Sequence, residues 1–219
     1  MSTPTSAVLL SSSLSALHLK TDTLFFALNY EFTKIKPKGM LKRFNKNKGT
    51  IDIDLACVLY DDNCTIIDMI WFKQLRDKVE SVKHQGDSLN GKDRGSQAMY
   101  NAPFDQEQIR LYLDQIPAHI THIAMIASSY YEQPFVQVDR GEIHLSDDEG
   151  NHAFGLNLKQ LPKECNALWV ASLRREVEDW HLTQHNLPLS ETDLEKAAQQ
   201  VAHELARALP LNQALSTFS

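Results

Sequence analysis

The chain has 219 residues, of which 42% are hydrophobic and 23% charged, which is the composition of a folded globular protein rather than a disordered or fibrous one. No apolar run approaches the roughly 20 residues that a membrane-spanning helix needs, and the first residues lack the features of a signal peptide. Three cysteines without a C-x-x-C pair argue against a disulfide framework and a cysteine-ligated zinc site, so we expect a cytoplasmic protein.

The formal net charge of −6 is unevenly distributed along the chain. Residues 1–50 have eight Lys or Arg against two acids, whereas the remainder has 14 basic residues against 26 acidic ones. Segment 34–48 alone has seven basic residues and no acid. Such a run attracts anionic surfaces, so docking to a membrane surface through 34–48 stays open beside a simple solvated loop. Because Phe44 is its only aromatic residue, we expect no nucleic-acid binding.

After a Ser/Thr-rich tail over 1–13, the chain reads as a succession of short strands separated by Gly, Pro, Asn and Asp clusters. We expect strands over 14–19, 24–30, 51–60, 65–72, 109–113, 121–128, 136–145, 153–158 and 167–177. No long helical period separates them, so βαβ units are not expected. The pattern predicts an all-β domain over 14–186, a two-sheet antiparallel β-sandwich of about ten strands.

The C-terminal part has a different periodicity. Residues 190–193 resemble a capping box, and an apolar stripe at helical spacing follows. The stripe consists of Leu194, Ala198, Val201, Leu205 and Leu209. We therefore predict one amphipathic helix over 190–209, ended by Pro210, which covers a face of its own domain or mediates self-association.

Two carboxylates lie close together in the strand predicted over 51–60. Asp52 and Asp54 are two residues apart, so their side chains emerge on the same face, together with Ala56 and Val58. Like charges on one face repel unless a cation lies between them. A lysine could supply that charge, but hard cations such as Ca²⁺ also bind carboxylate oxygens in this way.

A second group of oxygen donors follows in segment 86–95, which combines three glycines with Asp87, Asn90 and Asp93. Glycines let a backbone turn its carbonyls inward, and these side chains supply further oxygens. The spacing is not that of an EF-hand. Asp105 and Glu107 precede the next strand and are further candidate ligands. The sequence therefore predicts a calcium site formed by loops at the rim of the sandwich.

These residues resemble the tellurium-resistance TerD family over roughly 14–185. The strand Asp52-Ile53-Asp54-Leu55-Ala56 is similar to the D-x-D-x-S/A strand of the family. Segment 86–91 is similar to its G-D-N-x-T-G loop, 108–118 to the following strand and turn, and 135–138 to its F-G-Q-V motif. The resemblance implies a two-sheet β-sandwich, calcium binding through the acidic loops, a link to tellurite, phage and stress resistance, and action through other stress-response proteins.

The departures from the family pattern also carry predictions. Residues 96–104 form an insertion where family members continue the acidic loop, and in the loop over 129–134 only Glu132 remains as a carboxylate. The implied ligands are Asp52, Asp54, Asp87, Asn90, Asp93, Asp105, Glu107 and Glu132. Fewer charged ligands predict weak or single-site binding, with the dissociation constant moved from ~10⁻⁷ M toward ~10⁻⁴ M or weaker. A metal-free interaction scaffold stays open, because Lys92 and Arg94 could neutralise the acids themselves.

No known catalytic pattern is present in the sequence. It contains no G-x-S-x-G, Walker A or G-x-G-x-x-G motif, and His181 and His185 lack the glutamate of a zincin helix. The three cysteines form no dithiol that could reduce tellurite directly. We therefore expect a protein that is not an enzyme.

Overall fold

The structure is a computed structural model that describes residues 10–19, 22–31, 51–85 and 105–216, with side chains up to residue 208. Along the chain it has β1 (Ser11–Ser13), β2 (Thr23–Tyr30), β3 (Ile53–Tyr60), β4 (Ile66–Ile70), β5 (Val82–His84), β6 (Glu107–Tyr112), β7 (His122–Ser129), β8 (Gly141–Asp147), β9 (His152–Asn157), β10 (Ala167–Arg175), β11 (Trp180–Pro188) and α1 (Leu194–Ser216). Short 3-10 helices lie between strands: η3 (Leu113–Gln115), η4 (Phe135–Gln137) and η5 (Leu158–Gln160).

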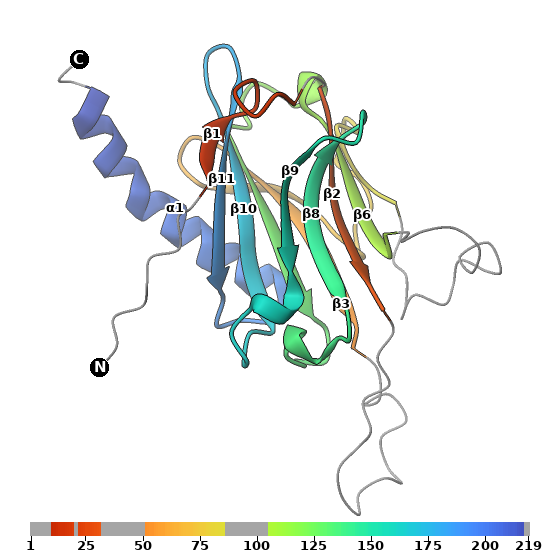
Figure 1. The fold of residues 1–219 in the computed structure, drawn as a ribbon. Helices are drawn as coiled ribbons and strands as arrows, with labels where there is room; N and C mark the ends of the chain where they lie inside the picture. Colours follow the sequence, from red (N-terminus) through yellow and green to blue (C-terminus); the bar gives the residue numbers. More distant parts are fainter. Residues whose placement is uncertain (1–9, 20–21, 32–50, 86–104, 217–219) are drawn as a thin grey trace, which may run out of the picture.

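The strands form two facing antiparallel sheets (Figure 1). The first sheet has the order β1-β11-β10-β7-β3-β4, and the second has the order β5-β6-β2-β8-β9. Alternation along β3 explains how the layers pack. Ile53, Leu55 and Cys57 belong to the core between the sheets, whereas Ala56 and Val58 belong to a separate cluster on the outer face. The predicted antiparallel β-sandwich with a C-terminal helix is confirmed.

Helix α1 covers the outer face of the first sheet. Figure 1 shows it running diagonally along one side of the sandwich, with its C-terminal end beyond the strands. Its buried residues are four of the predicted stripe and two alanines beside it: Leu194, Ala197, Ala198, Val201, Ala202 and Leu205. The side chain of the fifth stripe residue, Leu209, lies outside the described residues. The Tyr60 hydroxyl also donates a hydrogen bond to the Ala198 carbonyl, at 2.9 Å. The helix therefore packs on its own domain.

The ends of α1 differ from the prediction. Asp193, not Ser190, is the N-cap, because its Oδ1 accepts the Lys196 backbone N–H at 3.0 Å. Ser190 instead bonds the side chain of Gln200. The helix continues to Ser216, past Pro210, so the predicted stop at that proline was wrong. A proline removes one intrahelical hydrogen bond, and a helix can continue beyond it.

Three short or polar strands were not predicted: β1, β5 and β11. Strand β1 is three serines, inside the segment interpreted as a tail, and it pairs with β11 at the edge of the first sheet. Such strands are too short or too polar to stand out as the apolar runs between turn formers on which the prediction relied. Conversely, residues 14–19 form turns rather than a strand, because their apolar side chains pack on the core without ladder pairing.

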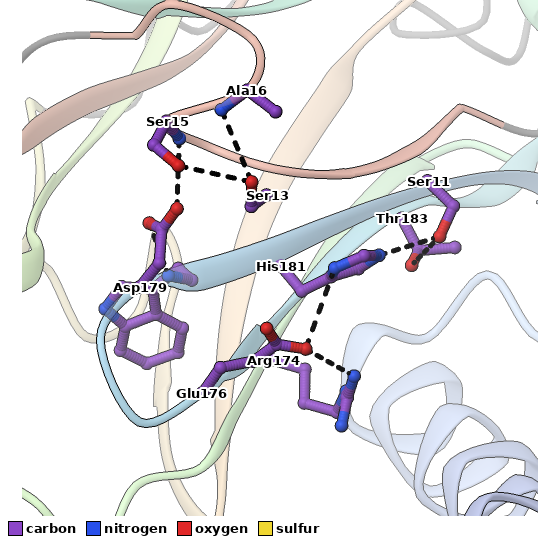
Figure 2. Close-up of polar contacts among 10 residues, drawn as sticks. Ser11, Ser13, Ser15, Ala16, Arg174, Glu176, Asp179, His181 and Thr183 are labelled. Carbon is purple, nitrogen blue, oxygen red and sulfur yellow. Dashed lines mark hydrogen bonds and ion pairs between the residues drawn. The ribbon is translucent and has the colours of Figure 1, made fainter. Parts of the chain in front are cut away.

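Polar side chains attach β1 to the rest of the sheet (Figure 2). Ser11 Oγ lies 2.9 Å from His181 Nε2, and the other ring nitrogen of His181 lies 3.7 Å from Glu176, which also accepts a hydrogen bond from Arg174. Further along, the Ser15 backbone N–H donates to Asp179 at 3.0 Å. Partial burial raises the pKa of Asp179, but the hydrogen bonds that it accepts, including those from Ser15, outweigh this effect and lower the pKa. The contacts give the N-terminal strand a fixed register.

A second histidine of β11 predicts how stability depends on pH. His185 stacks on Trp169 with ring centroids 3.7 Å apart, its Nε2 lies 2.8 Å from Ser172 Oγ, and burial lowers its pKa to about 4. Between pH 6.5 and 4 the unfolded chain binds a proton that the folded chain does not, so stability falls as the pH falls. We expect about 2 kcal/mol of the free energy of unfolding to be lost through this residue between pH 7 and pH 5.

Urea unfolding of wild type and His185→Asn at both pH values measures this contribution. The variant should lose less stability on acidification than wild type does. Parallel losses of stability in the two proteins would contradict a neutral, half-buried His185.

Candidate metal centre

The aspartate pair, Asp52 and Asp54, lies where β3 begins. Asp54 pairs with Ser128 of β7, and the carbonyl of Asp52 accepts the backbone N–H of Tyr130 at 2.9 Å. Both aspartates are buried, and Asp54 belongs to the outer face of the sheet, where it lies near Leu194 at the start of α1. Buried carboxylates need compensating charge or hydrogen bonds, so the surroundings of this pair determine what it can bind.

The charges of three predicted ligands act on Tyr30, at the end of β2. Burial raises the pKa of the Tyr30 phenol, and the charges of Asp52, Glu107 and Asp54 raise it further. The phenol therefore stays protonated, and it donates a hydrogen bond to the Ile51 carbonyl at 3.3 Å, across the two sheets. Acids from both sheets, Asp52 and Asp54 in one and Glu107 in the other, thus act electrostatically on one phenol.

Glu132 is held in a tight turn after β7. Its φ of +59° lies in the left-handed region, which costs a non-glycine residue about 1 kcal/mol. Hydrogen bonds fix this conformation: the Glu132 N–H donates to the Ser129 carbonyl at 3.0 Å, and the Glu132 carbonyl accepts from Asn166 Nδ2 at 3.2 Å. The turn brings its exposed side chain to the hollow that Asp54 lines.

We call this hollow the acidic hollow. It has a volume of about 310 Å³ and is lined by Asp54, Trp71, Phe72, Lys73, Tyr130, Glu132, Thr192, Asp193 and Leu194. Its carboxylates come from β3, from the turn after β7 and from the N-cap of α1. Lys73 is the one basic residue among those lining it. The arrangement is suited to binding a positively charged group.

Glu107 and Asp105 lie against histidines instead. Glu107 Oε2 lies 2.8 Å from His84 Nε2, and both side chains are almost fully buried, at 2% and 0% exposed. Asp105 lies 3.8 Å from His144 Nε2. Burial lowers the pKa of His144, and the charge of Asp105 partly offsets that effect. Neither acid lines the acidic hollow.

Asp87, Asn90 and Asp93 lie outside the described residues, so their predicted role stays a prediction. Within 10–19, 22–31, 51–85 and 105–208, no three His, Cys, Asp or Glu side chains come close enough to hold a metal ion together. Hard oxygen donors are nevertheless present in the acidic hollow, and Ca²⁺ also accepts main-chain carbonyls and water. Asp54 and Glu132 therefore fit part of a calcium site that needs further oxygens.

Comparison with known proteins identifies the family of this chain. The sequence model of the TerD domain matches residues 13–200. The chain belongs to the TerD family. It is 30% identical over 173 residues to the tellurium resistance protein TerZ of Serratia marcescens, covering 79% of this chain and 80% of that protein. It is 28% identical over 154 residues to the stress response protein SCP2 of Bacillus subtilis (strain 168), covering 66% and 72%.

Solved structures of TerD-like folds agree with the architecture. A homologue of the telluride resistance protein TerD from Streptomyces coelicolor A3(2), SCO6318, superposes with a TM-score of 0.62 at 10% identity, over 80% of this chain and 94% of that one. A protein of unknown function, SAV2460, superposes with a TM-score of 0.61 at 13% identity, over 79% and 92%. At these identities the likeness establishes the fold alone.

Several residues around the TerD-like acidic pair were not predicted as part of a site. Asp193 was interpreted only as part of a helix start, and Trp71 only as a core residue, which it also is at 8% exposed. Phe72, Lys73 and Tyr130 have no sequence pattern that relates them to Asp54. They converge because β3, β4 and β7 are neighbours in one sheet and α1 begins beside them.

No helix among the described residues is long and apolar enough to cross a membrane. The three cysteines, Cys57, Cys64 and Cys165, are free thiols in the interior. Burial raises the pKa of Cys165 to about 11, so its thiol stays protonated at neutral pH.

Proposed function

We propose that this chain is a calcium-binding stress-response protein of the TerD family that acts through protein partners rather than by catalysis. Its relatives TerZ and SCP2 are named for tellurium resistance and for stress response. Free, protonated thiols are typical of a reducing compartment, and we place the protein in the cytoplasm.

The observation that supports calcium binding most directly is that Asp54 and Glu132 line one hollow. Asp52 is two residues from Asp54 in the chain, and its charge acts on the same phenol as that of Asp54. Further oxygen ligands would come from Asp87, Asn90 and Asp93, which the sequence supplies and which lie outside the described residues. Calcium, when bound, would neutralise these acids and crosslink the rim of the sandwich.

Thermal unfolding in EGTA and across a calcium titration tests the proposal. A ligand that binds only the folded chain at ~100 times its dissociation constant adds ~2.7 kcal/mol to the free energy of unfolding. With a dissociation constant of ~10⁻⁴ M this requires ~10 mM calcium, where we expect a rise in Tm of about 5 °C for a domain of this size, and no such rise with magnesium.

Asp54→Asn provides the residue-level test. Removing one carboxylate from the site should reduce the calcium-dependent rise in Tm to less than half, because fewer charged ligands weaken binding. Asp148→Asn, in the exposed turn between β8 and β9, is the matched control and should keep the full rise. An unchanged calcium response in Asp54→Asn would show that the Asp52 and Asp54 pair does not bind calcium.

The metal-free scaffold is favoured by a specific observation. The buried Glu107 already has His84 beside it, and Asp105 has His144, so two of the predicted ligands lie against protein side chains. In that case Tm should not change up to millimolar calcium. The membrane-docking alternative relies on segment 34–48, which lies outside the described residues.

A further inference from the structure

We infer that the acidic hollow is a binding site for a small organic cation, namely an alkylamine with protonated amino groups, such as a linear polyamine. This inference goes beyond calcium binding and does not depend on it. It rests on the walls of the hollow, on the ammonium group already placed beside them, and on the size of the space.

The walls combine ring faces with carboxylates. Trp71, Phe72 and Tyr130 line the hollow and form an edge-to-face series, with ring centroids 4.7 Å apart for the first pair and 6.1 Å for the second. Asp54 and Glu132 line the same space. Calcium accounts for the carboxylates, but a hard cation coordinated by oxygens gains nothing from aromatic rings. An alkylammonium ion uses both, because rings attract its charge and pack against its methylenes.

The ammonium group of Lys73 already makes a cation–π contact of this kind within the chain. Its Nζ lies 4.4 Å from the centroid of the Trp71 ring and 5.7 Å from that of Phe72. The same ammonium lies 3.7 Å from Glu195, but both side chains are well exposed, so this ion pair is weak and easily exchanged. Lys73 therefore places a protein-bound ammonium where we infer that a ligand ammonium binds, and it competes with the ligand.

The volume of the hollow favours a small molecule. About 310 Å³ lies at the low end of the range for small-molecule sites and exceeds the need of a single metal ion. The carboxylates of Asp54, Glu132 and Asp193 come from three different elements, so they can engage more than one amino group. A diamine or triamine with a short alkyl spacer matches this arrangement.

Isothermal titration calorimetry of the full chain with spermidine and with 1,4-diaminobutane tests the inference. The titrations are made in EGTA at constant ionic strength, so that a failure of calcium binding does not affect the result. We expect saturable binding of one amine per chain, and Glu132→Gln should weaken it. Absence of binding up to millimolar amine would overturn the inference.

Two neighbouring tyrosines provide a matched pair of variants. Tyr130 is 57% exposed and lines the hollow, whereas Tyr131 is 37% exposed and does not, so either can be removed with little effect on folding. Tyr130→Ala should weaken amine binding about fivefold through loss of a cation–π contact, and Tyr131→Ala should leave it unchanged. Lys73→Met should strengthen binding by a similar factor. Equal affinities for both tyrosine variants would mean that the amine binds by charge alone, which would overturn the assigned site.

Discussion

Glu107→Ala should destabilise the calcium-free protein by about 3 kcal/mol, because it removes a buried side chain and the carboxylate that lies 2.8 Å from His84. Both side chains are enclosed where β5 and β6 pair, so the lost contact is away from bulk water. Urea unfolding in EGTA measures the loss. It also decides between two roles for Glu107, because a residue that serves only as a calcium ligand should not stabilise the metal-free chain.

Two further variants make this prediction specific. Glu149→Ala changes an exposed glutamate in the turn between β8 and β9 and should cost less than about 0.5 kcal/mol. Replacing His84 and Glu107 together by leucine should recover much of the stability, since apolar residues of similar volume often substitute for a buried pair without loss. A Glu107→Ala variant as stable as wild type in EGTA would show that the pair contributes nothing to folding.

The layers of this fold were predictable where apolar residues form a continuous run or a helical stripe. Strands β2 and β3 were predicted as short, largely apolar runs bounded by turn-forming residues, and α1 was predicted because its buried residues recur at helical spacing. Strand β1 was not, because three serines have no apolar period and are placed by pairing with β11 and by contacts such as that of Ser11 with His181. Long-range pairing of this kind leaves no local signal.

The acidic pair of the candidate site could be predicted from the sequence, but the other residues that line the acidic hollow could not. Two acids at i and i+2 in a strand must share a face, so the relation between Asp52 and Asp54 follows from the sequence. The approach of Glu132 depends on a left-handed backbone turn, and the approach of Trp71 and Asp193 depends on sheet order and on where α1 begins. These contacts arise from the tertiary structure, and the spacing of residues in a single sequence does not indicate them.

Because α1 packs on this face of the first sheet, Val201→Asp is the second substitution that we expect to lower the free energy of unfolding strongly. Val201 is fully buried between α1 and the outer face of the first sheet, in the cluster that contains Val58, Ala124 and Ile126. An unpaired carboxylate there should cost about 4 kcal/mol of the free energy of unfolding, measured in urea at pH 7. Gln199→Asp, two residues away on the exposed side of the helix, is the matched control and should cost less than about 1 kcal/mol.

The outcome of Val201→Asp also bears on the acidic hollow, because α1 supplies Leu194 and its N-cap Asp193 to the walls of that hollow. If the helix detaches while the sandwich stays folded, far-ultraviolet circular dichroism should lose helical signal at a lower urea concentration than the strand signal. Amine binding should then be lost together with the helix. Retention of both the helix and full stability in Val201→Asp would contradict the packing of α1 on this face, and with it the closed shape of the hollow.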